Sequence, residues 1–146
     1  SQVHFIKLRL MNEKGKEVSQ NFYWRSNDKY EGRKTLTGPA TSGFEALSTL
    51  KQAKVKASVQ GYVQEGREYV KVRVKNTSGV IAFFTQLQLT DEMGTPVRPA
   101  FFTDNFFSLL PGETREVMVD TKKTDGTQYR IVVKGWNQSR QDILVK

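Results

Sequence analysis

Acidic side chains are the first candidates for chemistry, because two carboxyl groups about 5 to 10 Å apart can hydrolyse a glycosidic bond. The acids that stand out lie in expected turns that contain a glycine, as Asp91, Glu113 and Asp125 do. Carboxylates at such positions usually accept hydrogen bonds from backbone amides of the turn. We therefore expect no catalytic pair in this chain and do not expect it to be an enzyme by itself.

Histidine and cysteine chemistry is almost excluded, since the chain has one histidine and no cysteine. The missing thiols rule out disulfides, iron–sulfur clusters and Cys-ligated zinc. His4 has no second histidine with which to form a two-histidine metal site, and it alternates with Ile6 and Leu8 in a pattern typical of a strand. Asp104-Asn105 is a single pair rather than a calcium loop. No metal or cofactor is expected.

Aromatic residues form the second set of candidates, because exposed rings stack on sugars while amides and carboxylates bond the sugar hydroxyls. The candidates for carbohydrate contact are Trp24, Phe102, Asp104, Asn105 and Trp136. Each has a structural alternative: the rings can enter a core or a domain interface, and Asp104 and Asn105 can bond backbone groups of their own loop. The pattern favours these packing roles over a glycan platform.

The elements that must position these side chains are strands. Apolar residues alternate with polar ones in five runs, at 53–59, 69–74, 83–89, 115–119 and 129–133. Glycine-containing turns separate the runs at short intervals, which favours an all-β antiparallel sandwich. In the second run we expect Val70, Val72 and Val74 to face the core and Lys71 and Arg73 to face solvent.

The first part of the chain has a different organisation. Alternation on both sides of a turn near residues 12–16 predicts a β-hairpin within 1–28. Residues 29–52 read as a linker with a short helix near 43–50, where Ser42 and Glu45 have the spacing of a capping box. The sandwich should then occupy 53–146.

The hairpin poses a physical problem, because two strands alone are marginally stable in water. We expect one apolar surface that needs a cover, formed by Ile6, Leu8, Leu10, Val18, Phe22 and Trp24. The cover would be the following sandwich or the hairpin of a second copy in a homodimer.

The charge of the chain is +8, from 23 basic and 15 acidic residues among 146. Residues 1–52 carry nine basic and five acidic side chains and the remainder fourteen and ten, so each part contributes +4. Such even spreading is typical of solvated sheet faces rather than of a polyanion-binding patch. No apolar run is long enough for a membrane span. Neither nucleic acid nor membrane is expected as a partner.

Four strings, taken together and in order, resemble a known family. They are Asn-Phe-Tyr-Trp-Arg-Ser at 21–26, Val-Lys-Asn-Thr-Ser-Gly at 74–79, Asp-Asn-Phe-Phe-Ser-Leu-Leu-Pro-Gly-Glu at 104–113 and Gly-Trp-Asn at 135–137. The chain resembles the C-terminal immunoglobulin-like region of family two glycoside hydrolases of the β-mannosidase and exo-β-D-glucosaminidase type. The hairpin resembles the last two strands of the penultimate domain, and the residues from about 53 onward resemble the final domain.

The resemblance implies a non-catalytic accessory domain that supports a (β/α)8 barrel, on which the two catalytic glutamates of the family lie. The partners would be the catalytic and other domains of a parent chain that is periplasmic or secreted and bacterial. The first residue is serine rather than methionine, so we interpret the chain as a fragment. The alternative is an autonomous carbohydrate-binding module, whose partner would be a glycan.

Overall fold

A computed structural model describes residues 3–26, 44–65, 67–121 and 128–146. The chain divides into two compact units, Ser1–Leu50 and Lys51–Lys146. Strands predominate in the described residues, and the all-β, immunoglobulin-like class expected from the sequence is confirmed. No helix of the described residues is long and apolar enough to cross a membrane.

The first unit contains the hairpin, with β1 at Val3–Met11 and β2 at Glu17–Ser26. In their antiparallel register Ile6 lies opposite Tyr23, and Phe5 lies opposite Trp24. Residues directly opposite each other share a face of the sheet, whereas adjacent residues point to opposite faces. The expected single apolar surface is therefore wrong, because the hairpin is apolar on both faces.

Each face has its own composition. One face carries an aliphatic row along β1, in which Ile6, Leu8 and Leu10 are 41%, 55% and 63% exposed. The other carries a ring cluster in which Phe5 and Phe22 stack with centroids 5.9 Å apart. The short helix after the hairpin is a single 3-10 segment, η1, at Glu45–Thr49, without a side-chain cap. Ser42 of the expected capping box lies outside the described residues.

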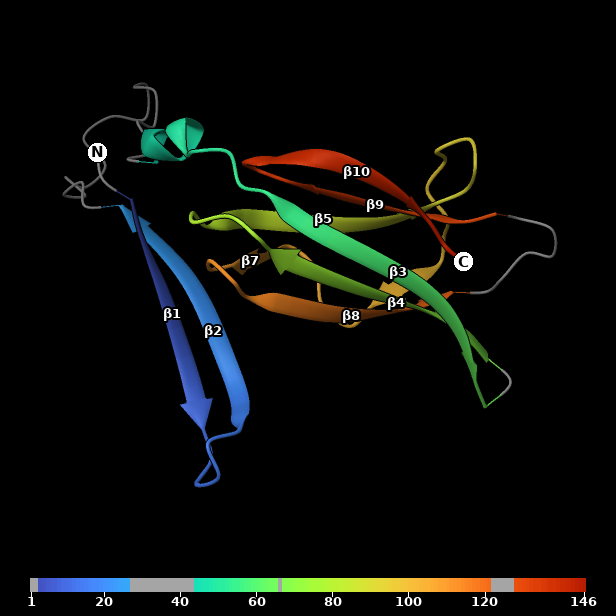
Figure 1. Cartoon of the computed structure of the whole chain (residues 1–146), viewed down its shortest axis with the longest axis horizontal. Coiled ribbons are helices and arrows are strands. Elements are labelled where there is room, and N and C mark those ends of the chain that lie inside the picture. Colours follow the sequence, from blue (N-terminus) through green and yellow to red (C-terminus); the bar gives the residue numbers. More distant parts are fainter. Residues whose placement is uncertain (1–2, 27–43, 66, 122–127) are drawn as a thin grey trace, which may run out of the picture. The chain divides into compact units, whose positions relative to one another are not determined.

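The second unit is a sandwich of two four-stranded antiparallel sheets (Figure 1). One sheet has the order β3-β4-β8-β6 and the other the order β10-β9-β5-β7. The strands are β3 Val55–Gln64, β4 Arg67–Asn76, β5 Ala82–Thr90, β6 Ala100–Phe102, β7 Phe107–Leu109, β8 Thr114–Thr121, β9 Arg130–Gly135 and β10 Gln138–Leu144.

The core lies between these sheets and follows the predicted alternation. Val70, Val72 and Val74 on β4 are 5%, 0% and 0% exposed. Val117 and Val119 lie beside them on β8 and are fully buried. Each such side chain contributes about 1.5 to 3 kcal/mol to stability when it leaves water.

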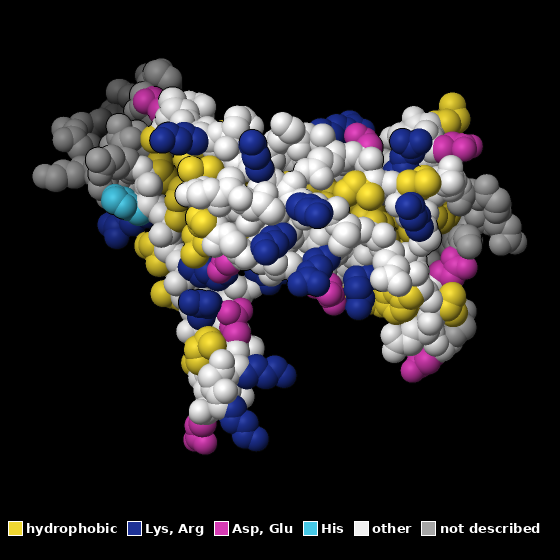
Figure 2. All heavy atoms as spheres, viewed as in Figure 1, with side chains coloured by type: hydrophobic (Ala, Val, Ile, Leu, Met, Phe, Trp, Pro, Cys, Tyr) yellow, Lys and Arg dark blue, Asp and Glu magenta, His cyan; other side chains and the backbone are white. Residues whose placement is uncertain are grey.

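The outward row of β4 carries the opposite chemistry. Lys71 pairs with Glu116 at 3.5 Å and lies over the ring of Tyr62, 5.8 Å from its centroid. Figure 2 shows Lys and Arg side chains as separate groups on the visible surface, with uncharged surface between them. The outward cations of β4 thus form a solvated sheet face, as the alternation predicts.

The acidic turn residues cap backbone amides, as expected. Asp91 Oδ1 accepts from the N–H groups of Met93 and Thr95 at 3.0 and 2.8 Å. Glu113 Oε2 accepts from the N–H of Leu110 at 2.9 Å. These carboxylates hold tight turns, and Asp125 lies outside the described residues.

Candidate functional site: an aromatic surface beside the β9–β10 turn

Three exposed or half-buried rings lie over a buried one at one end of the sandwich. Trp136, in the turn between β9 and β10, is 58% exposed, Phe106 is 49% exposed, and Phe84 is half-buried. Buried Phe83 lies beneath them, 6.4 Å from Trp136 and 5.8 Å from Phe84 between ring centroids, and Phe84 lies 5.4 Å from Phe106. We call Phe84, Phe106 and Trp136 the aromatic surface.

Phe84 reaches this surface through a bulge in β5. The pairing of β5 with β7 shifts between Ala82 and Thr85, so two residues of β5 lie opposite Ser108 alone. Phe84 takes a φ of 54°, and its N–H donates to Ser108 Oγ at 3.2 Å. The left-handed conformation breaks the alternation and turns the ring of Phe84 outward.

Phe106 reaches the same surface through a second left-handed residue, with a φ of 55°. The side chain of Asn105, the residue before Phe106, bonds both backbone groups of Leu87 on β5. Its Nδ2 donates to the carbonyl of Leu87 at 2.9 Å, and its Oδ1 accepts from the Leu87 N–H at 2.8 Å. The same Oδ1 accepts from the N–H of Phe106 at 3.0 Å. Asn105 therefore attaches its loop to the edge of β5.

Two buried amides hold Trp136 and the bulge together. Asn137 Oδ1 accepts from the N–H of Phe83 at 2.9 Å, and its Nδ2 donates to the carbonyls of Lys51 and Ile81, both at 2.8 Å. The N–H of Trp136 donates to the carbonyl of Phe83 at 3.0 Å. Gln138 Nε2 donates to the same carbonyl at 3.1 Å.

Glycine at 135 makes room for the second amide. A Cβ atom at that position would overlap the Gln138 side chain. In the sequence Gly-Trp-Asn-Gln at 135–138, the glycine leaves room for the Gln138 side chain, and the side chains of Asn137 and Gln138 bond the backbone of β5.

The conformations of Phe84 and Phe106 are strained, because a left-handed backbone costs a residue with a Cβ atom about 1 to 2 kcal/mol. Such outliers persist where the surrounding structure over-determines them, and they motivate a functional hypothesis. Here Ser108 and Asn105 supply the bonds that hold them. The two strained conformations bring the rings of Phe84 and Phe106 together at the surface.

The carbohydrate-contact candidates of the sequence have different surroundings. Trp24 belongs to the hairpin unit and is 41% exposed. Phe102 packs against the core, and Asp104 Oδ2 pairs with Arg115 Nη1 at 3.4 Å. Of these candidates, only Trp136 lies on the aromatic surface. Asn105 accepts a hydrogen bond from the N–H of Phe106, which belongs to the same surface. Contact of these residues with a glycan stays a prediction.

An ion pair on β10, close to the β9–β10 turn, shifts the pKa values of both of its members. Arg140 donates to both carboxylate oxygens of Asp142 at 2.9 and 2.8 Å. This hydrogen bond lowers the pKa of Asp142 and raises that of Arg140. The pair is exposed and lies on β10. Both shifts favour the charged forms of Arg140 and Asp142, so the pair is suited to an ionic contact rather than to proton transfer.

Phe84, Phe106 and the two amides were not among the sequence candidates. The available signal was the pair Phe83-Phe84, because two adjacent large rings cannot both follow an alternating pattern. Nothing local identifies Asn137 as their partner, since it bonds residues 54 and 86 positions away.

Comparisons with known proteins agree with this architecture. A family model described as the exo-beta-D-glucosaminidase Ig-fold domain matches residues 35–138. Exo-beta-D-glucosaminidases of Amycolatopsis orientalis and Streptomyces avermitilis are 31% and 32% identical over 98% of the chain, which spans 15% and 17% of their lengths. The crystal structure of the Amycolatopsis orientalis exo-chitosanase matches 99% of the chain with a TM-score of 0.84 at 29% identity, and the chain spans 18% of it.

Fold and site together define an immunoglobulin-like β-sandwich with a strongly held aromatic end. The chain belongs to the family of Ig-fold domains of exo-β-D-glucosaminidases. A mannosylglycoprotein endo-beta-mannosidase of Lilium longiflorum is also related, at 27% identity over 65% of the chain.

Proposed function

We propose that this chain is a non-catalytic accessory domain of a larger exo-β-glucosaminidase-type glycoside hydrolase, and that its aromatic surface packs against the rest of the parent chain. The observation that carries the proposal is the fixed aromatic surface at the end of the sandwich where the chain enters it. Asn137, next to Trp136, bonds the carbonyl of Lys51, the first residue of the second unit.

The orientation of the rings favours protein packing over sugar stacking. A sugar platform needs rings that lie in one plane, because a pyranose presents a flat C–H face. Within the aromatic surface, the planes of Phe84 and Phe106 are inclined by 44°. Trp136 meets the buried ring of Phe83 edge-on, at 69°. Tilted and edge-on rings are the usual arrangement in cores and protein interfaces.

The length of the relatives supports a partner within the same polypeptide. The matched exo-β-D-glucosaminidases extend far beyond the region that this chain spans, which is 15 to 18% of their lengths. Both faces of the hairpin also carry large apolar side chains, more than a soluble two-stranded unit leaves in water. In this proposal the hairpin completes a preceding immunoglobulin-like domain, and the catalytic carboxylates lie in another domain of the parent.

The proposal predicts a selective effect of removing the aromatic surface in the full-length parent enzyme. We expect the double variant Trp136→Ala/Phe106→Ala to lose about 2 to 4 kcal/mol of interdomain stabilisation, since central aromatic residues dominate interfaces. Calorimetry should show the accessory domain unfolding in a separate, earlier transition, while the same double variant of the 146-residue chain keeps nearly its own melting temperature.

Phe101→Ala is the matched control for this prediction. Phe101 is 68% exposed on β6 of the other sheet, so its replacement also deletes an exposed ring. An equal shift of the transition in both variants would contradict docking through the aromatic surface. Affinity electrophoresis in chitosan tests the alternative, because retention that depends on Trp136 would favour an autonomous carbohydrate-binding module.

A further inference from the structure

Four exposed cations lie together on the outward face of the β3-β4-β8-β6 sheet, and we call Lys54, Lys56, Arg73 and Lys75 the cation cluster. Lys56 lies directly opposite Lys75 in the register of β3 and β4, and Arg73 is the next residue of β4 on the same face. The carbonyl of Lys54 accepts from the N–H of Thr77 at 2.9 Å, which continues this pairing by one residue. Lys54 therefore shares the face of Lys56.

The carboxylates of this sheet face are paired with other cations. Glu116 lies opposite Arg73 on β8, but its carboxylate pairs with Lys71 at 3.5 Å. Asp120 pairs with Arg67 at 2.8 Å. In the part of the chain that the structure describes, no carboxylate pairs with a member of the cation cluster. The cluster thus leaves four positive charges uncompensated on one small area.

This arrangement costs the isolated chain stability, because like charges directly opposite each other on neighbouring strands repel. Small polar residues separate the cations: Ser58 lies opposite Arg73, and Thr114 lies opposite Lys75 on β8. Both are exposed, so no large side chain of these positions keeps a partner away from the cations. Carboxylates of a partner would replace the repulsion by attraction.

The cation cluster lies close to the turn that carries Trp136. The N–H of Ala53 donates to the carbonyl of Asn137 at 2.8 Å, and Ala53 forms a bridge with Gln138. Lys54 follows Ala53 directly. The cluster and the aromatic surface therefore occupy the same end of the sandwich. Protein interfaces commonly combine an apolar centre with a polar and charged rim.

We propose that the cation cluster binds an acidic surface of another domain of the parent chain, and so extends the interface that the aromatic surface forms. Ammonium and guanidinium groups make strong hydrogen bonds with carboxylates, and complementary charges fix the orientation of two partners. A second copy of this chain is a poor partner, because it would bring the same cations together. The proposal rests on the proposed function, since it places the partner within the parent.

A nucleic acid fits this face less well than an acidic protein surface. Binding of a polyanion needs a continuous positive stripe or patch. Here the carboxylates of Glu116 and Asp120 interrupt the positive charge toward the other end of the sheet. The compact cluster suits a few carboxylates of a folded domain.

Carbodiimide cross-linking of the full-length parent tests the contact, because this reagent joins an amine to a carboxylate that already touches it. Mass spectrometry should find Lys54, Lys56 or Lys75 joined to an Asp or Glu outside the 146 residues. Lys146 is the control: it is also exposed, and it follows β10 whereas Trp136 precedes that strand, so it lies at the other end of the sandwich. It should not be linked to the rest of the parent.

Charge reversal measures what the contact contributes. In Lys54→Glu/Lys56→Glu the new carboxylates share a face with Lys75, so the 146-residue chain should keep its melting temperature. In the parent we expect the accessory domain to unfold roughly 4 to 8 °C earlier at low ionic strength. In 1 M salt, where the Debye length is about 3 Å, most of this shift should disappear.

Arg98→Glu/Lys146→Glu reverses two exposed cations outside the cluster and changes the net charge equally. It should leave the transition of the parent in place. Equal shifts in the two double variants, or absence of the expected cross-links, would overturn the proposal. So would binding of the parent to DNA that Lys54→Glu/Lys56→Glu abolishes, because the cluster would then serve a polyanion.

The outcomes separate this proposal from the proposed function. No effect of Lys54→Glu/Lys56→Glu, together with the predicted loosening of the parent by Trp136→Ala/Phe106→Ala, would overturn the cation contact alone. A parent whose transition moves in neither variant would contradict docking through this end of the sandwich altogether. Cross-linking uses the unchanged parent, so it decides the matter even if a variant fails to fold.

Discussion

Replacing Val72 by aspartate is expected to unfold the sandwich unit. Val72 is fully buried at the centre of β4, between Val59 on β3 and Val117 on β8. An unpaired carboxylate at that position costs several kcal/mol, in addition to the lost packing, against a total stability of roughly 5 to 15 kcal/mol. Circular dichroism during urea unfolding should show Val72→Asp without a cooperative transition, or with one shifted to much lower urea.

Lys75→Asp provides the control on the same strand. Lys75 is exposed and lies directly opposite Lys56, so the substitution introduces the same side chain while removing a like-charge pair. We expect its stability to lie within about 0.5 kcal/mol of the unchanged chain. Comparable destabilisation by both variants would show that both faces of β4 are buried.

The sandwich was accessible from the sequence because its main signal is local. Alternation from Val70 to Val74 defines the buried face without knowledge of any neighbour, and the observed burial follows it. The prediction of a single apolar face on the hairpin was wrong, because the face on which Phe22 lies depends on how β2 pairs with β1. A one-residue difference in that register moves every side chain of the strand to the other face.

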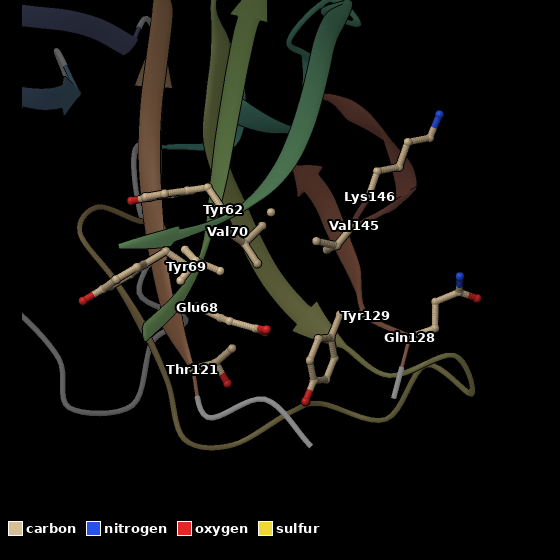
Figure 3. A pocket seen from close by; sticks show the side chains of 11 residues that line it. Tyr62, Glu68, Tyr69, Val70, Thr121, Gln128, Tyr129, Val145 and Lys146 are labelled. Atoms are coloured by element: carbon tan, nitrogen blue, oxygen red, sulfur yellow. The ribbon is translucent and has the colours of Figure 1, made fainter. Parts of the chain in front are cut away.

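The aromatic surface and a cavity at the opposite end of the sandwich were inaccessible for a related reason. Phe84 adopts its left-handed conformation because Ser108, 24 residues later, accepts its N–H bond. The cavity depends on the registers of three strands, which bring together Glu68, Thr121 and Tyr129 in its lining (Figure 3). Both arrangements depend on contacts between residues that are far apart in the sequence, so local patterns do not predict them. Each coincides with a break in the alternation of apolar and polar residues.

Asn137 is the side chain whose loss should damage the aromatic surface most. It is 2% exposed, and its amide satisfies the carbonyls of Lys51 and Ile81 and the N–H of Phe83. Asn137→Ala would leave these three backbone groups without their partner, and each buried unsatisfied group costs about 1 to 3 kcal/mol. We expect a loss of about 3 to 5 kcal/mol in the free energy of unfolding, measured by urea titration.

Ser139→Ala separates this effect from a general sensitivity of the strand. Ser139 is exposed two residues further along the chain, in β10, so its truncation should cost less than about 0.5 kcal/mol. In a Trp24→Phe background Trp136 is the only tryptophan, and its fluorescence reports on the turn. Acrylamide should quench Trp136 more efficiently in Asn137→Ala, because the turn loses its attachment to the bulge of β5. Unchanged quenching with a stability loss no larger than that of Ser139→Ala would mean that the turn holds its ring without the amide.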